Sequence, residues 1–153
     1  MRMTTILSAT FCILLAGCGK EAPVPVPPPT GSAVTAEDTS RIRGLWLAAS
    51  LRREEGKPEE VPNGYSLRFE NGNFTMEVAD SNEVGRYTLL SSTNPKQIDL
   101  MTNDGGLRRG LYALDGDKLT ICMPDEKDAP RPTEFKAAAE DTRISVITFT
   151  RSK

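Results

Sequence analysis

Residues 65–78 read YSLRFENGNFTMEV, and this stretch decides the fold class. Apolar and polar side chains alternate on both sides of Asn71-Gly72, with Tyr65, Leu67 and Phe69 before it and Phe74, Met76 and Val78 after it. A period of two is typical of strands that bury one face. Asn-Gly between two such runs is the strongest short-range hairpin signal. The stretch therefore predicts two antiparallel strands joined by a tight turn.

The same period continues through residues 40–153. Leu45, Leu47, Ala49 and Leu51 alternate with Trp46 and Ala48, and further strands are expected over 84–90, 97–101, 107–114, 118–123 and 144–151. Turn sequences at 103–106 and at Asp115-Gly116, the latter expected as a type I′ turn, separate these runs. We predict an all-β domain of about eight antiparallel strands in up-and-down order, closed into a barrel because closure removes unpaired edges. A two-sheet sandwich is the alternative.

Three connecting segments interrupt the strand pattern. A short helical turn is expected at residues 39–42, before the first strand. Residues 54–64 form the longest early loop, which we interpret as a lid over the barrel mouth or as a plain connector. Residues 124–142 form a longer connection in which 133–139 are expected as one or two helical turns, or as a flap across a barrel end.

The N-terminus predicts export and lipid anchoring. Met1-Arg2 and a short apolar run through Leu15 have the composition of a secretory leader, which is too short to span a bilayer. The ending LAGC at 15–18 resembles a bacterial lipobox, which implies a signal peptide over 1–17 and lipidation of Cys18. By the usual sorting rule for such proteins, Gly19 after the lipidated cysteine favours the outer membrane of the cell envelope. The predicted membrane partner is therefore reached through Cys18.

Residues 18–39 are expected to connect this anchor to the domain. The segment is rich in proline, which favours polyproline II and a semi-rigid spacer, with a ligand for a proline-binding domain as the alternative. Cys12 leaves with the leader and Cys18 carries lipid, so only Cys122 remains. We therefore expect no disulfide within the domain.

Composition excludes several classes of function. The 19 basic and 21 acidic residues nearly balance, so a nucleic-acid partner is not expected. The chain has no histidine, which removes Ser-His and Cys-His catalysis and the commonest zinc ligand. Asp115 and Asp117 lack the ligand spacing of a calcium loop, and Cys122 lies between apolar neighbours as a small buried residue would. We expect no metal, no cofactor and no enzymatic activity.

Charged pairs in the domain are candidate binding sites. Arg52-Arg53 and Arg108-Arg109 suit anionic lipid or polysaccharide, but solvated strand ends are the expected role. The acidic pairs, including Asp125-Glu126, are expected in exposed loops.

Several segments together resemble an uncharacterised domain family expanded in planctomycete bacteria. They include GLW at 44–46, PKQIDL at 95–100, GDKLTIC at 116–122 and RPTEF at 131–135. The resemblance implies a secreted or lipid-anchored β-domain and supplies no established biochemical activity.

A second resemblance is to lipocalin-like barrels, which carry Gly-x-Trp on the first strand. Gly44-Leu45-Trp46 fits that pattern. The resemblance implies an arginine after the last strand that packs over Trp46, a position that suits Arg151 better than Arg143. Such a stack would close one end of the barrel and add a cation–π interaction.

The barrel interior is the remaining place for function. Its large side chains, which either line a ligand cavity or fill the core, are Tyr65, Phe69, Phe74, Met76 and Tyr112. The first hypothesis is therefore a lipid-anchored protein that binds a small apolar or amphipathic ligand. The second is a structural or protein-interaction module with a filled barrel and unknown partners, and a hydrolase is the least favoured.

Overall fold

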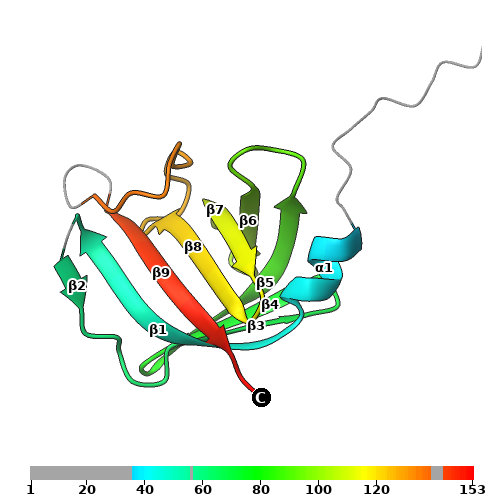
Figure 1. Ribbon diagram of the computed structural model, residues 1–153, viewed down its shortest axis with the longest axis horizontal. Helices are drawn as coiled ribbons and strands as arrows, with labels where there is room; N and C mark the ends of the chain where they lie inside the picture. Colours follow the sequence, from blue (N-terminus) through cyan, green and yellow to red (C-terminus); the bar gives the residue numbers. More distant parts are fainter. Residues whose placement is uncertain (1–35, 56, 139–142) are drawn as a thin grey trace, which may run out of the picture.

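The computed structural model describes residues 36–55, 57–138 and 143–153 (Figure 1). The predicted signal peptide, Cys18 and most of the predicted tether lie outside the described residues. The elements are α1 (Ala36–Ile42), β1 (Gly44–Glu54), β2 (Lys57–Glu59), β3 (Ser66–Glu70), β4 (Asn73–Val78), β5 (Ser81–Leu90), β6 (Gln97–Thr102), β7 (Leu107–Asp115), β8 (Lys118–Pro124) and β9 (Ile144–Arg151).

The strands form one closed, antiparallel, eight-stranded barrel, which confirms the predicted fold class. The order is β1-β3-β4-β5-β6-β7-β8-β9, and β9 pairs with β1 from Trp46↔Arg151 to Arg52↔Val146. Closure of this kind leaves no edge in the barrel wall, which excludes the sandwich alternative. The short β2 pairs only with the far end of β1, so part of the predicted 54–64 loop is a strand.

The hairpin turn at Asn71-Gly72 and the turn between β7 and β8 are of different types. Asn71 and Gly72 have φ of 50° and 80°, so both central residues are left-handed, as a type I′ turn requires. The turn between β7 and β8 is centred on Gly116-Asp117, because Asp115 pairs with Lys118. Only Gly116 has a positive φ there, of 56°, which fits type II′ and corrects the type I′ prediction at Asp115-Gly116.

A β-bulge in β1 changes which side chains face the core. Trp46 and Leu51 are 0% and 1% exposed, whereas Leu47 is 45% exposed. Ala48 pairs with Phe149 but Ser50 pairs with Thr148, so Ala49 is the extra residue of the bulge. The inward face therefore passes from even to odd positions along the strand.

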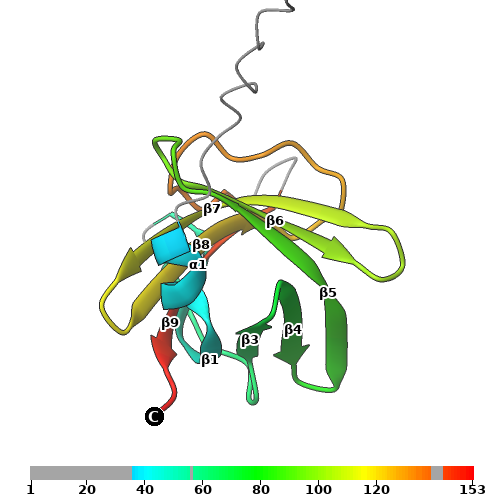
Figure 2. The same cartoon turned by 90° about the vertical axis from the view of Figure 1, so that its right-hand side faces the viewer.

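Helix α1 closes one end of the barrel (Figure 2). It begins at Ala36, inside the segment predicted as tether, and its last residue, Ile42, is fully buried. The Trp46 indole Nε1–H donates to the Ile42 carbonyl oxygen at 2.7 Å. The helix is thereby fixed to the first strand at the closed end.

A buried carboxylate also holds α1 in place. Asp38 is 2% exposed, and it accepts hydrogen bonds from Lys96 Nζ at 2.7 Å and from the Tyr112 hydroxyl at 2.8 Å. Burial pushes the pKa of Asp38 up, but these hydrogen bonds and the charges of Lys96 and Arg41 outweigh burial, so its pKa lies below the usual value. The carboxylate is therefore ionised and paired at neutral pH.

Residues 131–138 cover the outer face of β7 and β8. Over this range the chain forms no helix, and it contacts the barrel wall instead of crossing an end, which corrects both predictions for 133–139 as far as residue 138. An apolar cluster separate from the barrel core lies between this segment and the strands, and it consists of Leu111, Cys122, Ala137 and Val146. Cys122 is 0% exposed and burial raises its pKa to about 11, which confirms a small buried side chain.

Among the described residues, no helix has the length and apolar character needed to cross a bilayer.

Candidate functional site

The five predicted lining residues divide between a filled core and a pocket. Phe69, Phe74 and Tyr112 are at most 2% exposed and belong to the core, where the Phe69 ring lies 4.8 Å from the Tyr87 ring. Tyr65 and Met76 instead border a pocket at the end of the barrel opposite α1. The part of the barrel nearest α1 is therefore packed with side chains, and free space lies at the opposite, open end.

The predicted Trp46–Arg151 pair lies at the closed end, away from that pocket. The Arg151 guanidinium carbon is 4.2 Å from the centroid of the Trp46 ring. The same guanidinium donates to the carbonyl oxygens of Arg41 and Arg43, just where α1 ends. Arg143, the alternative partner, is exposed at the start of β9. Arg151 thus joins the last strand, the first strand and the helix, which is a structural task.

The space at the open end, which we call the mouth pocket, has a volume of about 270 Å³. Its walls come from β1, β4, β7, β8, β9 and the segments before β3 and after β8. The lining residues are Arg53, Tyr65, Met76, Val78, Arg108, Met123, Pro124, Asp125, Ser145 and Ile147. The apolar members continue the core, and the polar members form a layer above it.

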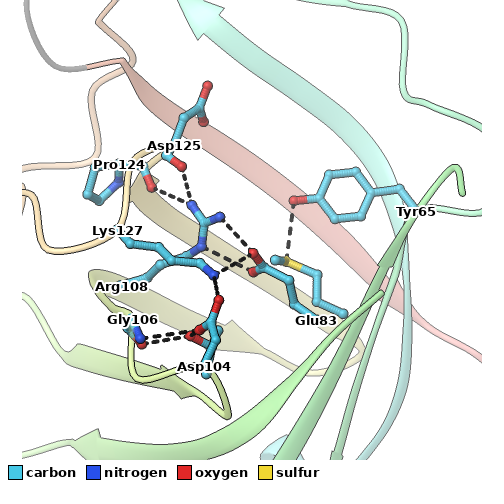
Figure 3. Close-up of polar contacts among 10 residues, drawn as sticks. Tyr65, Glu83, Asp104, Gly106, Arg108, Pro124, Asp125 and Lys127 are labelled. Carbon is cyan, nitrogen blue, oxygen red and sulfur yellow. Dashed lines mark hydrogen bonds and ion pairs between the residues drawn. The ribbon is translucent and has the colours of Figure 1, made fainter. Parts of the chain in front are cut away.

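Arg108 is held entirely by protein acceptors. Its Nη2 and Nε donate to the two carboxylate oxygens of Glu83 at 3.1 and 3.3 Å, so β7 is tied to β5 across β6. Its Nη1 donates to the carbonyl oxygens of Pro124 and Asp125 (Figure 3). These four hydrogen bonds use four of the five N–H groups of the guanidinium, so Arg108 stabilises the wall of the mouth pocket.

Lys127 and Asp104 extend the network to the rim. Lys127 Nζ lies 2.6 Å from Asp104 Oδ2 and 3.4 Å from Glu83 Oε1. The hydrogen bonds from Lys127 and Thr102 hold the pKa of Asp104 far below its usual value. The pKa of Lys127 is raised mainly by its hydrogen bond to Asp104. The rim charges therefore neutralise one another.

Asp125 and Arg53 form the other side of the layer. Asp125 Oδ1 accepts from the Ser145 hydroxyl, and Asp125 Oδ2 lies 3.3 Å from Arg53 Nε. Arg53 Nη1 donates to Glu59 of β2 at 2.9 Å. The Arg53 Nε–H is buried, however, and is not aligned with a protein acceptor among the described residues. The Arg53–Asp125 contact is therefore an ion pair, and the buried nitrogen offers no surface to a ligand.

Tyr65 supplies a donor with spare capacity. Its ring packs edge-on against Phe149 with centroids 5.6 Å apart. Its hydroxyl contacts the Met76 sulfur at 3.9 Å, and a dashed line marks this contact at Tyr65 in Figure 3. A thioether is a weak acceptor. Burial and the nearby Asp125 raise the pKa of Tyr65 to about 12, so the hydroxyl keeps its proton at neutral pH.

A larger hollow lies on the outside of the barrel, and we call it the outer groove. It has a volume of about 520 Å³ and is bordered by Leu45 and Leu47 of β1, Arg68 of β3, Glu77 of β4 and residues 61–65. Its lining combines apolar side chains with the charged Arg68 and Glu77. Tyr65 borders both this groove and the mouth pocket.

Sequence reasoning missed the polar layer. Arg53, Arg108 and Asp125 were interpreted as solvated, yet each lines the mouth pocket. Arg108 is in phase with the inward-facing Gly110 and Tyr112, so strand alternation alone could have placed it. Arg53 is in phase with the inward Leu51 only because of the bulge in β1.

Among the described residues, no group of three or more Cys, Asp or Glu side chains is arranged to hold a metal ion. No family model, no curated protein and no solved structure matches the chain.

Proposed function

We propose that this chain is a lipid-anchored protein of the bacterial cell envelope whose barrel binds a small amphipathic ligand at its mouth, without catalysis. The observation that supports binding is the mouth pocket itself, where a polar layer that includes the underused Tyr65 hydroxyl covers an apolar floor. Ligand sites usually combine an apolar wall with a few converging polar groups. The pocket is shallow because core side chains fill the barrel below it.

The absence of catalysis is proposed from the state of the ionisable groups. General acid–base chemistry needs a group whose pKa lies near the working pH. The pKa of Tyr65 is raised to about 12, far from neutral pH. Arg108 donates hydrogen bonds to Glu83 and to two carbonyl oxygens. Asp125 accepts a hydrogen bond from Ser145 and pairs with Arg53. These groups are suited to holding a ligand in place.

Native mass spectrometry of the full chain tests the binding proposal. We expect a population that carries added mass of a small molecule, and we expect Val78→Phe, which fills the mouth pocket, to lose it. Leu47→Ser in the outer groove is the matched control and should retain the added mass. A bare spectrum for the unmodified chain, or equal retention by Val78→Phe, would overturn the proposal.

The anchor is tested separately. The LAGC ending at 15–18 supports lipidation of Cys18, and two acyl chains are enough for stable anchoring. We expect Cys18→Ala to move the protein from the membrane fraction to the soluble fraction, whereas Cys122→Ala should leave it in the membrane fraction. Membrane retention of Cys18→Ala would exclude the anchor.

A protein-interaction module is the second candidate, and the outer groove favours it. Leu47 is 45% exposed there beside Leu45, next to a hollow larger than the mouth pocket. Crosslinking in cells should then recover a protein partner that Leu47→Ser loses and Val78→Phe retains. The two candidates are thus separated by the same pair of variants.

A further inference from the structure

The charges of the mouth pocket are already paired, and this limits the kind of ligand that fits. The Arg108 guanidinium donates hydrogen bonds to the Glu83 carboxylate and to two carbonyl oxygens. Asp125 is shared by Ser145 and Arg53, and Arg53 also pairs with Glu59. An anionic or cationic ligand would have to break one of these pairs and leave a partly buried charge without its partner, which is costly.

The spare hydrogen-bonding capacity of the pocket includes a donor, the Tyr65 hydroxyl. Among the described residues, this hydroxyl contacts only the Met76 sulfur. A buried donor without a good acceptor is unfavourable, so a ligand that supplies an acceptor oxygen removes that penalty. The pocket therefore favours a ligand with an acceptor oxygen, and a charged ligand would find no unpaired opposite charge there.

The remaining wall sets the size and polarity of the rest of the ligand. Met76, Val78, Met123 and Ile147 form an apolar floor. At about 30 Å³ per water molecule, the volume of about 270 Å³ corresponds to about nine waters (270/30), and hence to a ligand with a similar number of heavy atoms. The space suits a short alkyl chain.

We propose that the mouth pocket binds an uncharged, short-chain acyl compound, such as an amide or ester, whose carbonyl oxygen accepts from the Tyr65 hydroxyl. Its alkyl chain lies on the methionine-containing floor. This inference rests on the proposed function and adds the chemical class of the ligand.

Three probes of nearly equal size test the class: hexanamide, hexanoate and hexylamine. The purified full chain labelled with ¹³C in its methionine methyl groups reports binding by NMR, because Met76 and Met123 line the pocket. Met101 is 54% exposed on β6, does not line the pocket, and serves as an internal control. We expect hexanamide to shift the Met76 and Met123 signals and leave Met101 unchanged, with hexanoate and hexylamine at least about tenfold weaker.

Two tyrosine variants locate the acceptor contact. Tyr65→Phe removes one hydrogen bond, so hexanamide affinity should fall about tenfold. Tyr87→Phe is the matched control, because the Tyr87 hydroxyl is also buried and finds no hydrogen-bond partner within the part of the chain that the structure describes, but the Tyr87 ring lies in the core against Phe69. It should leave the affinity unchanged. If Tyr65→Phe does not fold, as judged by its methyl spectrum, Val78→Phe replaces it and should abolish the hexanamide shifts.

The outcomes separate the two proposals. Hexanoate or hexylamine binding at Met76 and Met123 as tightly as hexanamide would overturn the ligand class and leave mouth binding standing. An absence of hexanamide shifts would also overturn the ligand class. Whether the mouth pocket binds any ligand would then be decided by the added mass in the native mass spectra. Equal affinities of the Tyr65→Phe and Tyr87→Phe variants would exclude the assigned contact.

Discussion

Arg151 shows how one side chain can connect three elements. It stacks on Trp46, and its guanidinium donates to the carbonyl oxygens of Arg41 and Arg43, which are free because the helix ends there. Arg151 Nε also lies 3.2 Å from Asp117 Oδ1, but the Asp117 side chain is 75% exposed. The carbonyl contacts and the aromatic stack therefore carry the stabilisation, and the surface ion pair adds little.

Arg151→Met should lower the free energy of unfolding by about 2–3 kcal/mol, since it removes a cation–π contact and two charged hydrogen bonds. Trp46 is the sole tryptophan, so its fluorescence follows urea unfolding directly. Asp117→Asn is the control and should change stability by less than about 0.5 kcal/mol. Equal effects of the two substitutions would contradict this assignment.

Ala79 carries local backbone strain in the turn between β4 and β5. Its φ is 50°, in the left-handed region that a Cβ disfavours. Ala79→Gly should stabilise the protein by up to about 1 kcal/mol, because relief of this strain exceeds the added entropy of the unfolded chain. Ala79→Val is the opposite variant and should destabilise it. A loss of stability in Ala79→Gly during thermal unfolding would show that the turn is not strained.

At the scale of elements, α1 illustrates how tertiary contacts stabilise a short helix. Seven residues are too few for a helix to persist alone in water. Three features hold it instead: buried Ile42, the Arg151 contacts at its C-terminal end, and the buried Asp38 carboxylate. The pattern of the chain predicted a helical turn at 39–42, and the contacts to Lys96 and Tyr112 extend it to Ala36.

Asp38→Asn should reduce the free energy of unfolding at neutral pH by about 2 kcal/mol, since a charged hydrogen-bond acceptor is lost. The pKa of Asp38 is below its usual value in the folded protein, so its contribution is complete above about pH 4, the unfolded value, and is lost as pH falls through the folded value. The stability difference between the two proteins should therefore shrink below pH 4. Urea titrations at several pH values measure it, and a constant difference would refute the linkage.

At the scale of the whole molecule, closure between β1 and β9 makes the barrel a single cooperative unit. Thr148 pairs with Ser50 on one side and Thr120 on the other, so β9 has no free edge at this point. Interior side chains from the strands meet in one core, and the ribbon of β9 lies beside that of β1 (Figure 1). Loss of this strand would expose the core along its length.

Thr148→Pro should therefore lower the free energy of unfolding by about 3 kcal/mol or more, because proline removes a ladder donor from a central strand. Thr148→Val keeps both the backbone donor and a β-branched side chain and should stay within about 1 kcal/mol of the original protein. Calorimetric unfolding compares the variants. A Thr148→Pro protein with an unchanged transition would show that the barrel does not depend on closure here.

The sequence by itself determined the features that depend on neighbouring residues. Alternation of period two located the strands, Asn71-Gly72 specified its turn, and the short turns implied up-and-down order, because local geometry controls each of these. The expected alternation in β1 was displaced by one residue at Ala49, since a bulge forms only when the partner strand is in place. The type of the turn at Gly116 likewise depended on the pairing of Asp115 with Lys118.

Only the tertiary structure decided the candidate site. Arg53, Glu83, Arg108 and Asp125 come from separate segments, and no local pattern shows that they meet at one end of the barrel. Their pairing and the spare donor of Tyr65 arise from barrel closure, which brings strands distant in the chain to one rim. Sequence period fixes the face on which a side chain lies, whereas its partners depend on register and curvature around the whole barrel.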